Sequence, residues 1–193
     1  EGAPTEMETT AVILAIAYLL LAIRENRWCW PAGVASALLY LGVFYGAGLY
    51  MEAWLQLFYA AMGVYGWWAW RPGSEGTAPV TIQRWPLRRH AVALAVSMLF
   101  SLASGALLER YTQAASPYLD SVVTWSAVLT TWMVARKLLE NWLYWFVIDA
   151  VTLGLALERG LYPTAALVGL YLVLVVLGWR RWRLAWERRA VVA

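Results

Sequence analysis

Residues 141–149 read Asn-Trp-Leu-Tyr-Trp-Phe-Val-Ile-Asp and lie inside a strongly apolar segment of the chain. On a helix, Trp142, Trp145 and Asp149 fall at positions i, i+3 and i+7, so they share one face. A carboxylate about halfway along a membrane-length helix is costly, and such residues usually line a cavity or a pathway. Two indole planes beside it could stack on a flat cationic ring. In the alternative interpretation, the tryptophans serve only packing and Asp149 pairs with a neighbouring helix.

The composition indicates a membrane protein that crosses the bilayer several times. Hydrophobic residues make up 62% of the chain and charged residues 14%, against about 25% charged in soluble domains. One cysteine and one histidine exclude an internal disulfide, a multi-cysteine metal site and a histidine cluster. We find no phosphate-binding glycine loop and no nucleophile triad. We therefore expect an all-α membrane protein with no catalytic residues, no metal and no cofactor.

Seven apolar runs approach the roughly 20 residues that a helix needs to cross a bilayer. Pro31, Pro117 and Pro163 each fall at or near the first turn of a predicted span, where proline suits a helix start. The predicted spans are 9–23, 31–48, 52–70, 90–108, 118–135, 142–157 and 162–179.

Basic residues predict how these spans are oriented. If the N-terminus is outside, 13 of the 15 basic residues fall on the cytoplasmic side, and only Arg110 and Arg159 fall outside. Because Lys and Arg concentrate in cytoplasmic loops, we expect an external N-terminus and a cytoplasmic C-terminus.

The chain repeats itself with an offset of 112 residues, without a gap, over roughly fifty positions. The matched positions are Arg24 with Arg136, Trp30 with Trp142, Gly48-Leu49-Tyr50 with Gly160-Leu161-Tyr162, Tyr59 with Tyr171, Gly66-Trp67 with Gly178-Trp179, Trp70 with Trp182, and Arg71 with Arg183. A single helix joining two three-helix units gives both the same orientation, and such parallel repeats occur in secondary transporters. We predict a first three-helix bundle over 9–70, a linker and connecting helix over 71–117, a second bundle over 118–183, and a basic cytoplasmic tail over 184–193. This is a 3+1+3 arrangement.

Several polar residues that could form a substrate site are not matched by the same residue in the other repeat. Glu52, Gln56 and Tyr59 share one face of the third span. The repeat partners of Glu52 and Gln56 are Thr164 and Val168, and the partner of Asp149 is Ala37. An asymmetric ligand needs such an asymmetric site. The alternatives are that Glu52 is a solvated residue at the edge of the span and that Gln56 bonds only to another helix.

Several of these motifs together resemble the PnuC family of bacterial vitamin transporters. The matching elements are Trp30-Pro31-x-Gly33, Gly48-Leu49-Tyr50, Leu55-Gln56, Tyr65-Gly66-Trp67 with Trp70, Arg136-Lys137, Glu140-Asn141-Trp142 with Trp145 and Asp149, Gly160-Leu161-Tyr162 with Thr164, and Gly178 with Trp182. The resemblance implies a fold similar to SWEET carriers, a homotrimer in the bacterial inner membrane, and no nucleic-acid partner. It also implies facilitated diffusion with alternating access, coupled to a cytoplasmic kinase that phosphorylates the vitamin.

The resemblance assigns substrate binding to Gln56, Trp142 and Trp145. We add Asn141, Asp149, Glu52 and Tyr59 as candidates from the same faces. Nicotinamide riboside is the expected substrate, with thiamine close behind, because both are flat nitrogen heterocycles with a positive charge. Riboflavin, which is neutral and larger, is a further alternative within the family. An integral-membrane enzyme and a structural subunit are remoter hypotheses, since the chain offers no reactive cluster.

Overall fold

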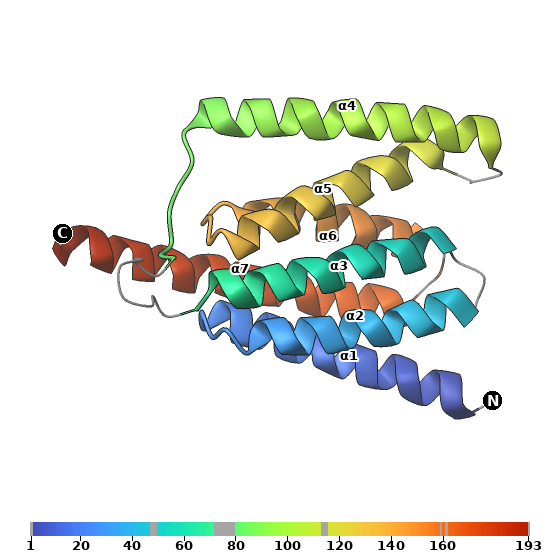
Figure 1. Cartoon of the computed structure of the whole chain (residues 1–193), viewed down its shortest axis with the longest axis horizontal. Helices are drawn as coiled ribbons and strands as arrows, with labels where there is room; N and C mark the ends of the chain where they lie inside the picture. Colours follow the sequence, from blue (N-terminus) through green and yellow to red (C-terminus); the bar gives the residue numbers. More distant parts are fainter. Residues whose placement is uncertain are drawn as a thin grey trace.

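The computed structural model describes residues 2–46, 50–71, 80–112, 116–158, 160 and 162–192, without the side chains of residues 2–5, 50–52 and 190–192. The described residues form seven α-helices that run roughly alongside one another and alternate in direction (Figure 1). The helices are α1 Gly2–Ile23, α2 Cys29–Gly46, α3 Tyr50–Ala69, α4 Leu87–Tyr111, α5 Pro117–Ala135, α6 Asn141–Glu158 and α7 Tyr162–Val192.

The predicted spans coincide with the observed helices, one span to each helix, which confirms the all-helical prediction. Pro117 is the first residue of α5, and Pro31 and Pro163 lie in the first turns of α2 and α7. At these positions the missing proline N–H removes no helical hydrogen bond. Of the segment predicted as a basic tail over 184–193, residues 184–192 are the last part of α7, and residue 193 lies outside the described residues.

Four of the described helices, α1, α2, α4 and α7, are long and apolar enough to cross a membrane. The other three carry residues that lower the hydropathy of a span: Gln56 in α3, Thr130 and Thr131 in α5, and Asp149 in α6. Polar residues at membrane depth face the interior of a bundle rather than lipid. Four helices therefore qualify as spans on their own composition, and seven spans stay a prediction.

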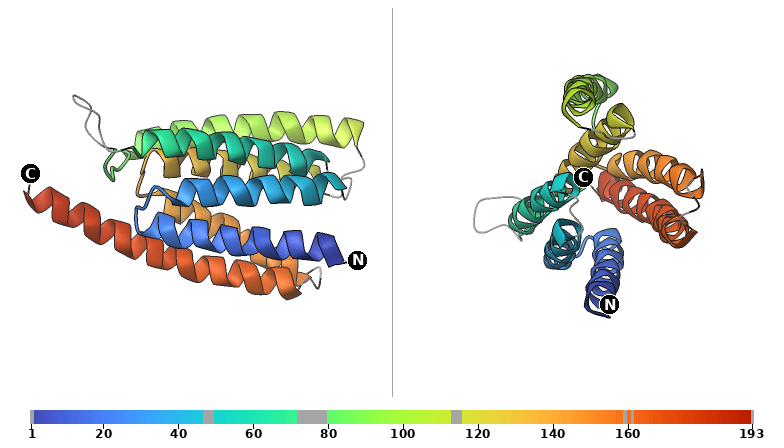
Figure 2. Two further views of the ribbon diagram at one scale, coloured as in Figure 1. Left: turned by 60° about the horizontal axis from the view of Figure 1, so that its bottom comes forward. Right: turned by 90° about the vertical axis from the view of Figure 1, so that its right-hand side faces the viewer.

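Helices that follow one another in the chain also pack against one another within α1–α3 and within α5–α7. Between these two groups, α1 packs against α7 and α3 packs against α5 (Figure 2). Among the described helices, α4 packs only against α5, and it lies at the edge of the molecule. Within the described part of the chain, α4 therefore has a single packing neighbour, α5.

A buried tryptophan and a glycine hold α2 against α3. The ring of Trp30 lies over Gly66, where a methyl group would overlap the indole. The same ring meets Trp70 edge to face, with ring centroids 5.4 Å apart and planes at 86°. Glycine is required here because only the absence of a side chain lets the indole approach the backbone. We call Trp30, Gly66 and Trp70 the first indole wedge.

The second group of helices contains the same packing unit. Trp142 lies over Gly178, again where a methyl group would overlap the ring. It meets Trp182 edge to face at 5.3 Å and 87°. These three residues, the second indole wedge, are the first wedge displaced by 112 positions. The sequence repeat therefore corresponds to a repeated packing unit.

The two wedges also connect the two groups of helices. The indole N–H of Trp70 donates to the carbonyl of Ala135 at the end of α5, at 3.0 Å. In the corresponding way, Trp182 donates to the carbonyl of Ala22 at the end of α1, at 3.1 Å. Both acceptors lie in the last turn of a helix, where carbonyls lack an intrahelical donor, although the Ala22 carbonyl also accepts from the amide of Glu25 at 3.0 Å.

An ion pair joins two turns that occupy equivalent places in the repeat. Glu25 follows α1 and Lys137 follows α5, and both have left-handed backbones, with φ of 54° and 50°. Lys137 Nζ lies 3.1 Å from Glu25 Oε2 and 4.6 Å from the centre of the Trp70 ring. Arg189 of α7 adds a contact to the same carboxylate at 3.3 Å. We call this end of the molecule, formed by the turns 24–28 and 136–140 and by residues 180–189, the basic end.

The segment before α4 also packs onto the basic end. The backbone of Gln83 donates to the carbonyl of Lys137 and accepts from the amide of Leu139, at 3.1 and 2.9 Å. Arg84 reaches the buried carboxylate of Glu140 at 2.9 Å. This segment thereby ties α4 to the turn between α5 and α6.

Candidate functional site

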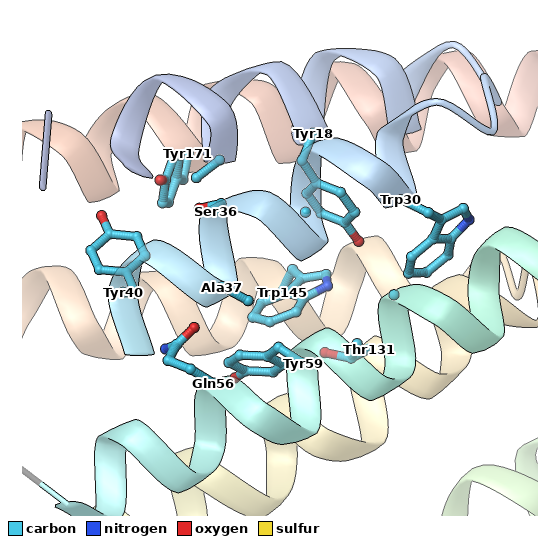
Figure 3. Close-up of a pocket in the computed structure, with 13 residues that line it drawn as sticks. Tyr18, Trp30, Ser36, Ala37, Tyr40, Gln56, Tyr59, Thr131, Trp145 and Tyr171 are labelled. Atoms are coloured by element: carbon cyan, nitrogen blue, oxygen red, sulfur yellow. The ribbon is translucent and has the colours of Figure 1, made fainter. Parts of the chain in front are cut away.

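A cavity of about 270 Å³ lies between the two groups of helices (Figure 3). Its lining comes from α1, α2 and α3 on one side and from α5, α6 and α7 on the other. The lining residues are Ala15, Tyr18, Trp30, Gly33, Ser36, Ala37, Tyr40, Gln56, Tyr59, Gly63, Thr131, Trp145 and Tyr171.

Three of the residues predicted from the sequence meet in this cavity: Gln56, Tyr59 and Trp145. The indole of Trp145 occupies the centre of the close-up, and the ring of Tyr59 lies beside it (Figure 3). The amide of Gln56 points across the cavity toward Tyr40. An aromatic face and an amide thus line the same space from α6 and α3.

A second cavity of about 190 Å³ adjoins the first, and the two share Ala15, Tyr18, Trp145 and Tyr171. Asp149 and Trp142 line this second cavity. Trp145 therefore stands at the boundary between a compartment with the Gln56 amide and a compartment with the Asp149 carboxylate. We call the two together the central cleft.

The polar groups of the central cleft differ in whether the protein already satisfies them. Ser36 donates to the carbonyl of Ala11 and Thr131 to that of Ala127, each at 2.8 Å. Within the described chain, by contrast, no hydrogen bond involves the side chain of Gln56, Tyr59 or Asp149, and each is only partly buried. Since polar groups at membrane depth need a partner, these side chains are available for a ligand or water.

The electrostatics of the cleft are set by one carboxylate. Among the residues that the structure describes, no lysine, arginine or histidine lines either cavity. Of the lining residues that the structure describes, Asp149 is the one that is acidic. In the same described residues, no three His, Cys, Asp or Glu side chains gather as a metal site would require. A cation in the cleft would therefore lie near the carboxylate of Asp149, whereas the described lining offers an anion no counter-charge.

The remaining residues predicted for the site are Asn141, Trp142 and Glu52. Asn141 is fully buried at the start of α6, where its Nδ2 donates to the carbonyl of Leu138 at 2.6 Å, and it lines neither cavity. Trp142 is 1% exposed and belongs to the second indole wedge, so only part of its ring borders the cleft. The side chain of Glu52 lies outside the described residues.

Sequence reasoning missed three tyrosines of the cleft: Tyr18, Tyr40 and Tyr171. One signal was present, because Tyr171 is the repeat partner of Tyr59, and the two line the same cavity from α7 and α3. Tyr18 and Tyr40 have no such signal, since an isolated tyrosine in an apolar helix equally suits packing or the interface.

The two repeats differ in chemistry at the cleft. The repeat partner of Trp145 is Gly33, which lines the same cavity. Asp149 and its repeat partner Ala37 likewise both line the cleft. At these matched positions, α6 carries an aromatic ring and a carboxylate, whereas α2 carries a glycine and an alanine.

The model of the nicotinamide mononucleotide transporter family matches residues 5–184. The riboflavin/roseoflavin transporter RibM of Streptomyces davaonensis is 28% identical over 181 residues, which cover 91% of this chain and 84% of RibM. The nicotinamide riboside transporter PnuC of Escherichia coli is 22% identical over 201 residues, with the same coverages of 91% and 84%.

One solved structure shares the fold. It is described as the crystal structure of the vitamin B3 transporter PnuC, and it superimposes with a TM-score of 0.78 at 21% sequence identity. The match covers 97% of this chain and 84% of that one. The family and these relatives are transporters, not enzymes. The chain therefore belongs to the nicotinamide mononucleotide transporter family, the PnuC family of vitamin-related membrane transporters.

Proposed function

We propose that the protein carries an unphosphorylated vitamin with a flat ring across the membrane by facilitated diffusion, with the central cleft as its substrate site. Nicotinamide riboside is the proposed substrate. The observation that carries the proposal is the pairing of the Trp145 ring with the unpartnered Gln56 amide and Asp149 carboxylate in one cleft. Most ligand sites combine an apolar, aromatic lining with a few polar groups in this way.

The absence of cations from the described lining favours a nucleoside over a nucleotide. A phosphate group carries about −1.5 to −2 charges at neutral pH, and its buried sites in proteins are built from arginine, lysine or backbone amides. A nucleotide in the central cleft would instead meet the carboxylate of Asp149. We therefore propose that nicotinamide mononucleotide, which gives the family its name, is not carried.

A positively charged ring would be attracted both by the indole of Trp145 and by the carboxylate of Asp149. The indole face attracts a cation through the quadrupole of the ring, and this attraction increases when the pair is removed from water. Asp149 on the adjoining compartment supplies the opposite charge. Nicotinamide riboside and thiamine both satisfy this arrangement, and thiamine is the first alternative.

Riboflavin is a second candidate because the relative at 28% identity is a riboflavin/roseoflavin transporter. Its ring system is uncharged, so it would use the aromatic lining and the Gln56 amide without needing Asp149. The Asp149→Asn substitution therefore discriminates between the candidates: it should weaken a cationic substrate and leave riboflavin unaffected.

We further propose that α1–α3 and α5–α7 are two parallel three-helix repeats, joined by α4 in a SWEET-like 3+1+3 arrangement that spans the membrane seven times. The matching indole wedges support this proposal. Rocking of one repeat against the other would open the central cleft alternately to each side. The same proposal includes an external N-terminus and a location in the bacterial inner membrane. It also includes a homotrimer and a cytoplasmic kinase that traps the vitamin.

Counterflow in proteoliposomes tests this function. Vesicles loaded with unlabelled nicotinamide riboside should accumulate the labelled compound transiently without an ion gradient, as a facilitator requires. Vesicles loaded with nicotinamide mononucleotide serve as the matched control and should give no accumulation. Exchange of the mononucleotide at an equal rate, or a strict need for an ion gradient, would overturn the proposal.

A further inference from the structure

A groove of about 720 Å³ lies between α1 and α7 at the basic end, separate from the central cleft. The two helices pack against each other although they stand at opposite ends of the chain (Figure 2). The residues that line the groove are Leu20, Ile23, Arg24, Glu25, Leu174, Leu177, Arg180, Arg181, Leu184, Ala185 and Arg188.

Apolar and basic side chains alternate along the groove at helical spacing. On α7, Leu177, Arg181, Leu184 and Arg188 follow one another at i, i+4, i+7 and i+11, so they share one face. The leucines are well exposed, Leu177 at 48% and Leu184 at 52%. This face therefore offers acyl-sized apolar surface next to guanidinium groups.

The opposite wall repeats the pattern on α1, where Leu20 precedes Arg24 by one turn. Leu20 is 42% exposed. On each wall a leucine, Leu20 or Leu177, thus lies one turn deeper in the bundle than an arginine, as it would for a molecule with an apolar body and an anionic head, and on α7 Leu184 lies between Arg181 and Arg188.

Four arginines in the groove have no counter-charge from the described residues. Arg24, Arg180, Arg181 and Arg188 are exposed, and none forms an ion pair within the part of the chain that the structure describes. The one carboxylate in the groove, Glu25, is already engaged by two cations, Lys137 and Arg189. The groove therefore carries an excess of positive charge.

We propose that this groove binds an anionic phospholipid such as phosphatidylglycerol, whose phosphate lies among the four arginines and whose acyl chains lie along the leucines. Guanidinium groups bind phosphate through paired hydrogen bonds, and basic pockets between membrane helices suit anionic headgroups. A zwitterionic lipid is disfavoured because its choline cation would meet the arginines. Because its walls belong to α1 and α7, the bound lipid bridges the first and last helices and stabilises their packing.

The test measures lipid retention by native mass spectrometry of the full chain, purified in detergent and supplied with phosphatidylglycerol, phosphatidylcholine or inorganic phosphate. The groove variant carries R24Q and R181Q, one substitution in each wall. The matched control carries R88Q and R89Q, which remove the same charge from α4. Wild type and control should retain phosphatidylglycerol and gain thermal stability from it.

Each arginine near a lipid surface contributes to binding, so the groove variant should bind phosphatidylglycerol roughly thirtyfold more weakly than wild type. Its vitamin binding should equal that of wild type, which shows that the variant is folded and separates this proposal from the proposed function. Equal loss in the control variant would mean that only total charge matters, and the site would be wrong. Equal stabilisation by inorganic phosphate or by phosphatidylcholine would also overturn it.

Discussion

At the scale of the residue, Gln56 makes the sharpest prediction because its amide lines the cleft without a hydrogen-bond partner in the described chain. Gln56→Leu should weaken substrate binding by about 1–3 kcal/mol while the unfolding temperature stays near that of wild type. Leu57→Ala, on the exposed side of the same helix, serves as the control and should change neither. Unchanged affinity with lost stability would indicate a structural role for the amide.

Trp145 and Trp142, which the sequence treats alike, should behave differently. Trp145→Ala should cost about 1–2 kcal/mol of binding; Phe should restore part of it, and Leu should not, because only Phe retains a π face. Trp54→Leu, at a position that is 68% exposed on α3, is the control. Equal affinities for the Phe and Leu variants of Trp145 would contradict stacking.

Trp142→Ala should instead destabilise the fold, because the ring is buried between Gly178 and Trp182. Removing a buried tryptophan costs about 3–5 kcal/mol, and Trp30→Ala in the first wedge should cost a similar amount. Chemical unfolding in detergent measures both. If Trp142→Ala keeps full stability and loses binding, the ring belongs to the site and not to the wedge.

At the scale of the element, the two indole wedges predict which glycines are required. Gly66→Ala and Gly178→Ala should each lower the free energy of unfolding by about 1–3 kcal/mol, since the added methyl group overlaps an indole. Gly154→Ala on α6 meets no neighbouring atom and should be neutral or stabilising, because alanine favours a helix. Equal effects at the three positions would show that packing against tryptophan is not the cause.

The ion pair between the equivalent turns makes a second prediction at this scale. Lys137→Gln should lower the free energy of unfolding by roughly 0.5–3 kcal/mol, the usual range of the interaction energy between two residues in contact. In a double-mutant cycle, Glu25→Gln should add little once Lys137 is replaced, apart from its separate contact with Arg189. Fully additive effects of the two substitutions would mean that the pair contributes no coupling.

The helices were predictable because each is a long apolar run, and all but α3 begin at or near a proline or follow basic residues. In the sequence, the wedges appear only as matched residues of the repeat. The close approach of the Trp142 ring to Gly178 depends on how α6 and α7 pack. For the same reason, helical spacing and the family resemblance placed Trp142 in the site, and Asn141 was added as its neighbour in the sequence. The sequence could not reveal that Asn141 bonds to Leu138 or that Tyr18 and Tyr40 reach the cleft.

At the scale of the whole molecule, the charge asymmetry predicts the orientation. A reporter fused after Ala193 should read as cytoplasmic and a tag placed before Thr9 as external, because 13 of the 15 basic residues fall on one side. The clustering of arginines at the basic end agrees with this orientation. A cytoplasmic N-terminus in a protein with seven intact spans would contradict it.

The central claim is that the cleft recognises an unphosphorylated flat ring through Trp145, Gln56 and Asp149, and a binding titration tests it most directly. The purified protein should be titrated with nicotinamide riboside, thiamine, riboflavin and nicotinamide mononucleotide under one set of conditions. We expect saturable binding of nicotinamide riboside that Gln56→Leu weakens about tenfold or more, and no measurable binding of the mononucleotide. Tighter binding of the mononucleotide than of the riboside would contradict the account, because the described lining offers its phosphate no counter-charge.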